Sequence, residues 1–197
     1  MNVISPADAM KRARILEGAT RVFLTYGFQR TTMDDIARAA EISRPALYLL
    51  FRNKTDIYRA LAGNMVSETL EETRDLLARD LPLADKLEGA LSCALDKTAF
   101  IEESPHGAEI LDMKHSLARD IIAAARAELA DMMEATIAEA TARRRADLAA
   151  QGLSPRLLVD MLLDAVDGMK LRNPDRPAQR SLARGFINVI VQSVEGG

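Results

Sequence analysis

Residues 31–54 read TTMDDIARAAEISRPALYLLFRNK, and this stretch decides the fold. Its capping and turn residues predict two short helices, over about residues 33–40 and 44–50, joined by a tight turn. The apolar residues are spaced so that the two helices can pack together: Ile36, Ala37, Ala40, Ile42 and Leu47. A helix-turn-helix of this size places its second helix in the major groove of DNA, so DNA binding is the first expectation.

Capping residues mark the start of both predicted helices. Thr32 can cap the first helix, and Asp35, three residues later, can complete a capping box. Ser43 can cap the second helix. Pro45 then falls in the first turn, where a missing N–H group costs no hydrogen bond. The start points of both helices are therefore encoded locally.

The same region carries a family resemblance. From about Ile15 to Ala62, the sequence resembles the DNA-binding domain of the TetR (tetracycline repressor) family of bacterial regulators. Many residue types match in order at fixed offsets: Ala19–Phe23, Tyr26–Phe28, Thr31–Ala37, Ser43–Tyr48, Phe51, Lys54 and Asp56–Ile57. There are two departures from the family pattern. Glu41 stands where the family usually has glycine in the turn, and Leu49 and Leu50 stand where it often has histidine or tyrosine.

Seven residues in and around the motif are candidate DNA contacts: Thr32, Arg44, Pro45, Ala46, Tyr48, Leu49 and Lys54. Three of them can contact bases. Arg44 lies at the start of the second helix, where its guanidinium can bind a guanine edge. Ala46 is small enough to approach a thymine methyl group. Of the two leucines at positions 49 and 50, one should face DNA, where it offers only apolar contact.

Three other candidates are suited to the DNA backbone. Phosphate contacts fix the register of a protein on DNA, and they come from hydroxyl and ammonium groups as well as from guanidinium groups. Thr32, Tyr48 and Lys54 carry such groups at the edges of the motif. Tyr48 has an alternative role, because its ring could instead be buried with the hydroxyl at the surface.

Composition limits the classes of protein that this chain can be. Of 197 residues, 48% are hydrophobic and 28% charged, the profile of a soluble globular protein. The longest hydrophobic run, residues 46–51, is far shorter than the roughly 20 residues that span a bilayer. A single cysteine, Cys93, excludes an internal disulfide and a Cys-rich zinc site. We expect a cytoplasmic protein with no membrane partner and no cofactor.

The net charge of −3 hides an asymmetry along the chain. Residues 1–54 hold nine Lys or Arg and five Asp or Glu, a balance of +4, whereas residues 55–197 hold 17 and 24, a balance of −7. A basic module on an acidic body is expected when only the module contacts phosphate. We therefore predict a helix-turn-helix DNA-binding domain over residues 1–54 and a helical ligand-binding and dimerisation domain over residues 55–197.

The rest of the chain indicates an all-α fold. Strand signals are nearly absent, and Gly and Pro separate segments of helical period. Asn173–Pro174 and Pro177 separate the last two segments. The predicted helices beyond the motif cover about residues 6–25, 55–79, 83–103, 107–114, 117–150, 155–172 and 178–194.

The last two predicted helices, 155–172 and 178–194, have unusually wide apolar faces. A surface helix hides about a third of its circumference, but these two must hide about two thirds. Either both are enclosed within the monomer, or each also packs on a second subunit. The body has little room for two interior helices, which favours a homodimer, and the resembled family usually dimerises through its last two long helices. The predicted interface residues are Leu158, Met161, Leu162, Met169, Phe186, Ile187 and Ile190.

An effector pocket is the second predicted site. Nine methionines are many for this length, and methionine adapts to irregular cavities and apolar ligands, although a methionine row at helical spacing is more often plain core. The resemblance implies an inducer near the ends of the predicted helices 83–103 and 107–114. The predicted ligand-binding residues are Met65, Phe100, Leu111, Met113, His115 and Met133.

Other chemistry has weaker support. His106, Glu109, Asp112 and His115 could hold a cation, but a carboxylate-bridged metal bundle needs paired motifs on two helices, so no metal is expected. No phosphate-binding glycine loop and no serine elbow occurs. We conclude that the sequence favours a homodimeric repressor that an apolar or amphipathic effector releases from a pseudo-palindromic operator. The alternatives are a helical-bundle enzyme and a protein-interaction module that uses the motif only for packing.

Overall fold

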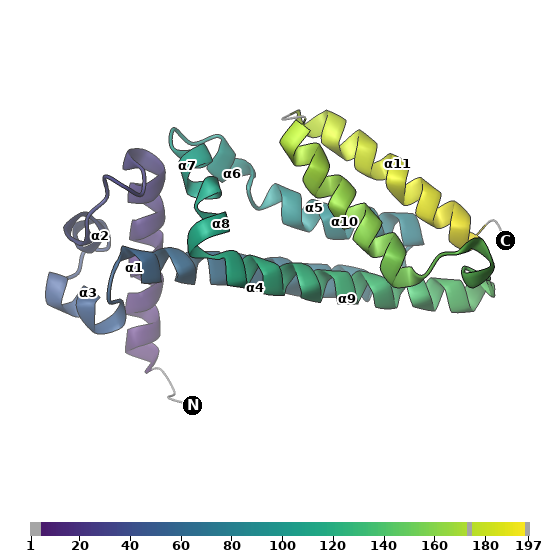
Figure 1. Ribbon diagram of the computed structural model, residues 1–197. Helices are drawn as coiled ribbons and strands as arrows, with labels where there is room; N and C mark the ends of the chain where they lie inside the picture. The colour runs from purple at the N-terminus through teal and green to yellow at the C-terminus, as the bar shows by residue number, and fades with distance from the viewer. Residues whose placement is uncertain (1–4, 173–174, 196–197) are drawn as a thin grey trace. The chain divides into compact units, whose positions relative to one another are not determined.

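The computed structural model describes residues 5–172 and 175–195, and every regular element in these residues is a helix (Figure 1). The predicted all-α fold is therefore confirmed. None of the described helices combines the length and the apolar character that crossing a membrane requires. The elements are α1 Pro6–Tyr26, α2 Met33–Ala39, α3 Arg44–Leu50, α4 Lys54–Leu77, α5 Leu83–Asp96, α6 Ala99–Glu102, α7 Gly107–Asp112, α8 Lys114–Leu117, α9 Arg119–Arg144, the 3-10 helix η1 Ala149–Gln151, α10 Pro155–Arg172 and α11 Arg176–Glu195.

The chain divides into two compact units, each built from two stretches of sequence. Unit 1 comprises residues 1–68 and 97–124, and unit 2 comprises residues 69–96 and 125–197. The division differs from the boundary predicted after residue 54. The first turns of α4 and the segment 97–124 belong with the helix-turn-helix, because they supply buried side chains to the same core: Ile57, Tyr58, Ala62, Ile110 and Ala118.

The core of unit 1 forms around α1. Ser5 caps α1 by accepting a hydrogen bond from the N–H of Asp8, at 3.1 Å. The helix ends at Gly27, whose φ of 81° favours glycine. A Cβ atom there would also lie 2.5 Å from the Glu109 carboxylate of α7, so that side chain would have to move. At Gly18, a Cβ atom would lie 2.8 Å from the Ala40 nitrogen, so that glycine permits the close approach of α1 and α2.

Unit 2 is a helical bundle whose core includes residues of α5, α9, α10 and α11. Two predicted helices in this part of the chain were too long. The prediction over 83–103 is interrupted after Asp96, and the prediction over 117–150 ends at Arg144. Arg145 has a φ of 55°, and the N–H of Ala146 bonds back to the Thr141 carbonyl at 3.1 Å, which terminates α9. The predicted break at residues 173–174 lies outside the described residues.

Candidate nucleic-acid interface

The start of α2 has the predicted capping box. Thr32 Oγ1 accepts from the N–H of Asp35 at 3.2 Å, and the N–H of Thr32 donates to the Asp35 carboxylate at 2.9 Å. The Thr32 hydroxyl also donates to this carboxylate at 2.6 Å, and these hydrogen bonds lower the pKa of Asp35. Thr32 is exposed, so its phosphate contact stays a prediction.

The turn between α2 and α3 is held by arginines from α1. Glu41 has a φ of 53°, so a side chain occupies a left-handed position that favours glycine. Arg14 donates to the carbonyls of Ala40 and Glu41, at 3.0 and 3.2 Å, and Arg21 donates to the Ala39 carbonyl at 2.6 Å. The last carbonyl groups of a helix accept no hydrogen bond within that helix. The two arginines supply the missing donors at the end of α2, and they also attach α2 to α1.

The helix α3 presents one outer face. Ser43 caps it, accepting from the N–H of Ala46 at 3.3 Å. Leu47 is fully buried, while Ala46 and Leu50 are half-buried. The exposed side chains are at positions i, i+1, i+4 and i+5, so they share a face: Arg44, Pro45, Tyr48 and Leu49. The ring of Tyr48 is exposed rather than buried, and the leucine that faces outward is Leu49.

Arg44 is already engaged within the motif. Its guanidinium lies 3.1 Å from the Asp34 carboxylate of α2 and 5.6 Å from the centre of the Tyr48 ring. Hydrogen bonding with Tyr48, followed by the charge of Asp34, raises the pKa of Arg44. A base contact by Arg44 would therefore compete with its interaction with Asp34. Arg44 and Asp34 are both more than half exposed, so this exchange is open to solvent.

Lys54 has a structural role that sequence reasoning missed. Its ammonium group donates to the carbonyls of Phe28, Gln29 and Thr31, at 2.7, 3.0 and 3.0 Å. It also lies 4.6 Å from the centre of the Phe28 ring. A lysine has three N–H donors, so these three carbonyls use all of them. The predicted phosphate contact would have to compete with the closure of the loop between α1 and α2.

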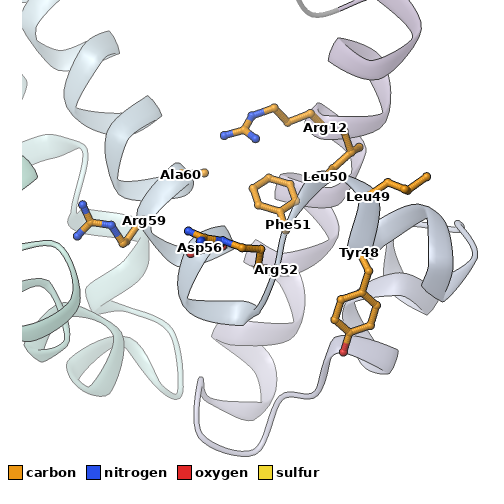
Figure 2. Close-up of a pocket in the computed structure, with 9 residues that line it drawn as sticks. All are labelled: Arg12, Tyr48, Leu49, Leu50, Phe51, Arg52, Asp56, Arg59 and Ala60. Atoms are coloured by element: carbon orange, nitrogen blue, oxygen red, sulfur yellow. The ribbon is translucent and has the colours of Figure 1, made fainter. Parts of the chain in front are cut away.

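An open groove of about 480 Å³ lies beside α3 (Figure 2). Arg12 of α1 contributes to its wall, with the guanidinium 4.5 Å from the centre of the Phe51 ring. Arg52 is paired with Asp56 at 3.0 Å. No carboxylate pairs with Arg12 among the described residues, so its N–H groups are available to an anion. The only feature of the sequence that could have indicated this role of Arg12 is its position as a basic residue one turn before the buried part of α1.

Comparison with known proteins identifies the motif. The family model described as "Bacterial regulatory proteins, tetR family" matches residues 15–61. Residues 15–61 therefore resemble the DNA-binding domain of the TetR family. It is 40% identical over 77 residues to the HTH-type transcriptional regulator TtgR of Pseudomonas putida, a match covering 39% of this chain and 34% of TtgR. The match thus spans about a third of that relative, and the resemblance read from the sequence is confirmed.

Solved structures extend the likeness in fold to nearly the whole chain. The fatty acid degradation regulator FadR from Bacillus halodurans has a TM-score of 0.66 at 17% identity, over 96% of this chain and 97% of that one. The SmeT–triclosan complex has a TM-score of 0.63 at 18% identity, over 93% and 91%. At these identities the likeness establishes the TetR-family fold alone.

The segment 97–124 is bonded to the part of the chain that carries the TetR-type motif. The N–H of Gln29, in the loop before α2, donates to the Glu109 carboxylate of α7 at 3.1 Å. The Tyr58 hydroxyl donates to the Ile110 carbonyl at 2.8 Å, and burial raises the pKa of Tyr58 to about 12. Segment 97–124 therefore contacts both the loop before α2 and the first turns of α4. Sequence reasoning missed this arrangement, because its partners lie far apart along the chain.

A second connection joins α4 to the start of α9. Arg59 donates to both carboxylate oxygens of Asp120, at 2.7 and 2.6 Å, and to the Leu117 carbonyl at 2.6 Å. The hydrogen bond from Arg59 lowers the pKa of Asp120 to about 2. The pair is charged throughout the physiological range.

The six predicted ligand-binding residues do not form one cluster. Met113 packs against the core of unit 1, whereas Met133 is fully buried in the core of unit 2. The side chains of Phe100 and His115 are exposed, and those of Met65 and Leu111 are half-buried. Helical period identifies a buried face but not the core that this face enters, so the sequence does not show which of these residues lie together. His106 lies 3.6 Å from Glu109, which also accepts the bond from Gln29.

Five of the seven predicted interface residues are buried within the monomer. They pack in the core of unit 2 and are at most 4% exposed: Leu158, Leu162, Met169, Ile187 and Ile190. Met161 and Phe186 remain exposed. With them, the outer face of α10 and α11 carries Leu157, Leu182 and Val189, all at least 40% exposed. The apolar surface is real, but most of its residues differ from those predicted.

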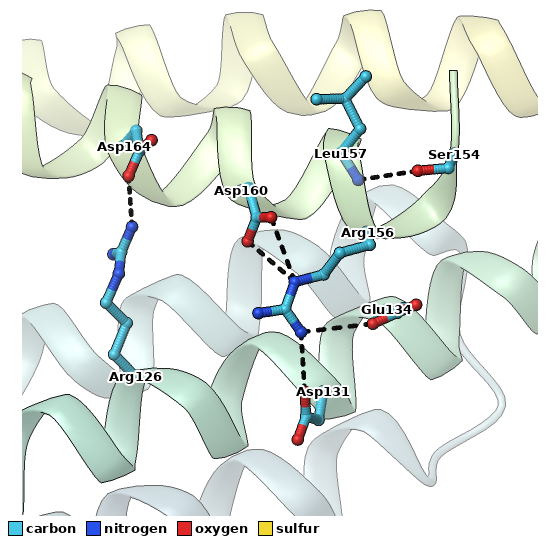
Figure 3. Close-up of polar contacts among 8 residues, drawn as sticks. All are labelled: Arg126, Asp131, Glu134, Ser154, Arg156, Leu157, Asp160 and Asp164. Atoms are coloured by element: carbon cyan, nitrogen blue, oxygen red, sulfur yellow. Dashed lines mark hydrogen bonds and ion pairs between the residues drawn. The ribbon is translucent and has the colours of Figure 1, made fainter. Parts of the chain in front are cut away.

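The charged stripes of α10 and α11 form ion pairs with neighbouring helices. Figure 3 shows Arg126 of α9 bound to Asp164 of α10, at 2.6 Å. Arg156 of α10 binds Asp160 on its own helix and Asp131 of α9, at 3.0 and 2.9 Å. On α11, Arg180 and Arg184 pair with Asp96 and Glu88 of α5. The charged stripes therefore lie against other helices of unit 2, and apolar side chains are left at the surface.

Proposed function

We propose that this chain is a transcriptional regulator that binds double-stranded DNA through the outer face of α3. The observation that carries the proposal is the exposed row of Arg44, Tyr48 and Leu49 on the second helix of a TetR-family motif. A guanidinium, a phenol and an apolar side chain on one helix face can each contact a base edge or a phosphate. The motif acts by binding, and no catalytic role is assigned to the chain.

The proposal includes a homodimer formed through α10 and α11. These helices pack on each other, and each leaves apolar side chains exposed at spacings of three or four residues, on one face. Contiguous apolar surface of this kind marks interaction sites. A second copy of the chain fits it, because the same face of the partner is equally apolar. Two motifs would then bind two half-sites of a pseudo-palindromic operator.

Effector control is the third part of the proposal. Helices α4 and α9 each begin in unit 1 and continue into unit 2. Segment 97–124, bonded to the motif, is continuous with α5 before it and α9 after it. A small apolar or amphipathic molecule that changes the bundle can thus act on the motif through these connections. To weaken operator binding 100-fold, such a ligand needs about 2.7 kcal/mol of coupling between the two sites. A protein that leaves its operator when the ligand binds acts as a repressor while the ligand is absent.

The test is direct measurement of DNA binding. A duplex selected by the purified chain from a random pool is compared with a scrambled duplex of the same composition, over about 50–200 mM salt. We expect preference for the selected duplex, with affinity for both falling steeply as salt rises, because phosphate contacts release counterions. Failure to bind any duplex at the lowest salt would overturn the proposal.

A further inference from the structure

Leu49 is exposed to an unusual degree. Its side chain is 86% exposed, whereas the other exposed large apolar residues of the described chain range from 38% to 71%. The other leucines of α3 turn inward, since Leu47 is buried and Leu50 is half-buried. Leu49 therefore contributes little to the core of unit 1, and its side chain is accessible to a partner outside the chain.

The surroundings of Leu49 restrict that partner. Leu49, Tyr48 and Leu50 line the groove beside α3, and the lining also includes the charged residues Arg12, Arg52 and Asp56 (Figure 2). An entirely apolar partner would strip water from these charges, which is costly. The partner must offer small apolar groups close to anions. The major groove of DNA does so, because the 5-methyl group of thymine projects into it between two rows of phosphates.

We propose that Leu49 reads thymine in the operator half-site by contact with its 5-methyl group. This inference rests on the proposed DNA-binding function and adds the base that one residue selects. Leucine offers no hydrogen bond, so selection depends on the methyl group itself. Deoxyuridine keeps every hydrogen-bonding atom of thymidine and lacks only that methyl group. It is therefore the matched probe for a contact of this kind.

The experiment replaces thymidine by deoxyuridine, one position at a time, in a duplex selected by the wild-type chain. Burial of one methyl group corresponds to roughly a fourfold change in affinity. We expect a loss of about this size at one or two positions in each half-site. Leu49→Ala should bind the thymidine and deoxyuridine duplexes equally at those positions. Leu49→Ser is a second variant with the same expectation.

Tyr26→Ala is the matched control. Tyr26 is also a large exposed side chain of unit 1, but it lies at the end of α1 rather than on α3. The control should keep the full deoxyuridine effect. Because Leu49 is exposed, its variants should unfold at the same temperature as the wild type, and circular dichroism checks this.

Two results would overturn the inference while leaving DNA binding intact. In one, no deoxyuridine substitution weakens binding of the selected duplex by the wild type. In the other, the loss persists in both Leu49 variants, which would assign the methyl contact to another residue such as Ala46. If no duplex is selected at all, the proposed function itself fails, which is a different result from either of these.

Discussion

At the scale of single residues, Asp34 limits the charge that α3 can offer to DNA. Its carboxylate lies 3.1 Å from the Arg44 guanidinium. Asp34→Asn should raise affinity for DNA, by up to about fivefold, because an exposed ion pair is worth at most about 1 kcal/mol. Glu17→Gln, which removes one negative charge from α1, is the control. Fluorescence anisotropy with a labelled duplex measures both, and equal or weaker binding by Asp34→Asn would contradict the account of Arg44.

Lys54 is a second residue whose role can be separated experimentally. Lys54→Met keeps the aliphatic stem but removes the ammonium group that joins three carbonyls of the loop. Hydrogen bonds from charged groups contribute about 1.5–3 kcal/mol, so the free energy of unfolding should fall by about 2 kcal/mol. Lys11→Met, at an exposed lysine of α1, should change it little. Unchanged stability in chemical denaturation, combined with weaker DNA binding, would restore Lys54 as a phosphate ligand.

Residue roles were predictable from the sequence where partners are local. The capping residues Thr32 and Ser43 act within three positions of themselves, and both form the expected hydrogen bonds. The partners of Lys54 lie 23 to 26 positions away, and the aromatic partner of Arg12 is Phe51. Local spacing cannot encode such pairs, because they depend on how α1 crosses the motif.

At the scale of elements, the periodicity of α10 and α11 predicted how wide their apolar faces are, but not which residues of those faces lie in the core. The width of their apolar faces was read correctly, and it indicated more burial than one core can supply. The charged stripe of each helix forms ion pairs with α9 or α5, such as Arg126 with Asp164. Those partners lie 38 positions apart. The predicted interface therefore named residues such as Ile190 that belong to the core.

The exposed face gives a prediction about assembly. Phe186→Arg places a charge in the proposed interface, where an unpaired buried charge costs several kcal/mol. We expect a monomer with unchanged helicity and weakened binding to a two-half-site duplex. Asn188→Arg adds the same charge to the polar stripe of α11 and should leave the dimer intact. Sedimentation velocity distinguishes the two, and a wild-type chain that is monomeric at micromolar concentration would refute the interface.

The pair of Arg59 and Asp120 predicts a pH dependence of stability. The folded-state pKa of Asp120 is lowered from 3.8 to about 2, so the carboxylate binds protons less readily in the folded state than in the unfolded state. Its contribution is therefore present above about pH 4 and is lost as pH falls toward 2. In Asp120→Asn, the free energy of unfolding should fall less steeply in this window. Identical slopes for the variant and the wild type would show that the pair does not stabilise unit 1.

At the scale of the whole molecule, the division into two units changes where control can act. Sequence reasoning placed the domain boundary after residue 54, because the recognisable motif ends there. The segment 97–124 joins the motif through Gln29, Tyr58 and Arg59, partners that lie 52 to 80 positions from their acceptors in that segment. Composition and hydrophobic periodicity cannot predict contacts between residues so far apart in the sequence. The family motif thus predicted that the first unit contains a helix-turn-helix, but it did not predict which other residues belong to that unit.

The central claim is sequence-specific binding by a dimer whose α3 helices enter successive major grooves. The most direct measurement is selection of bound duplexes from a random pool, followed by determination of the number of chains on the selected duplex. We predict an inverted repeat with half-sites about one turn, or ~34 Å, apart, and two chains or a multiple of two on each site. Selected sequences without an inverted repeat, or one chain on one duplex, would contradict it.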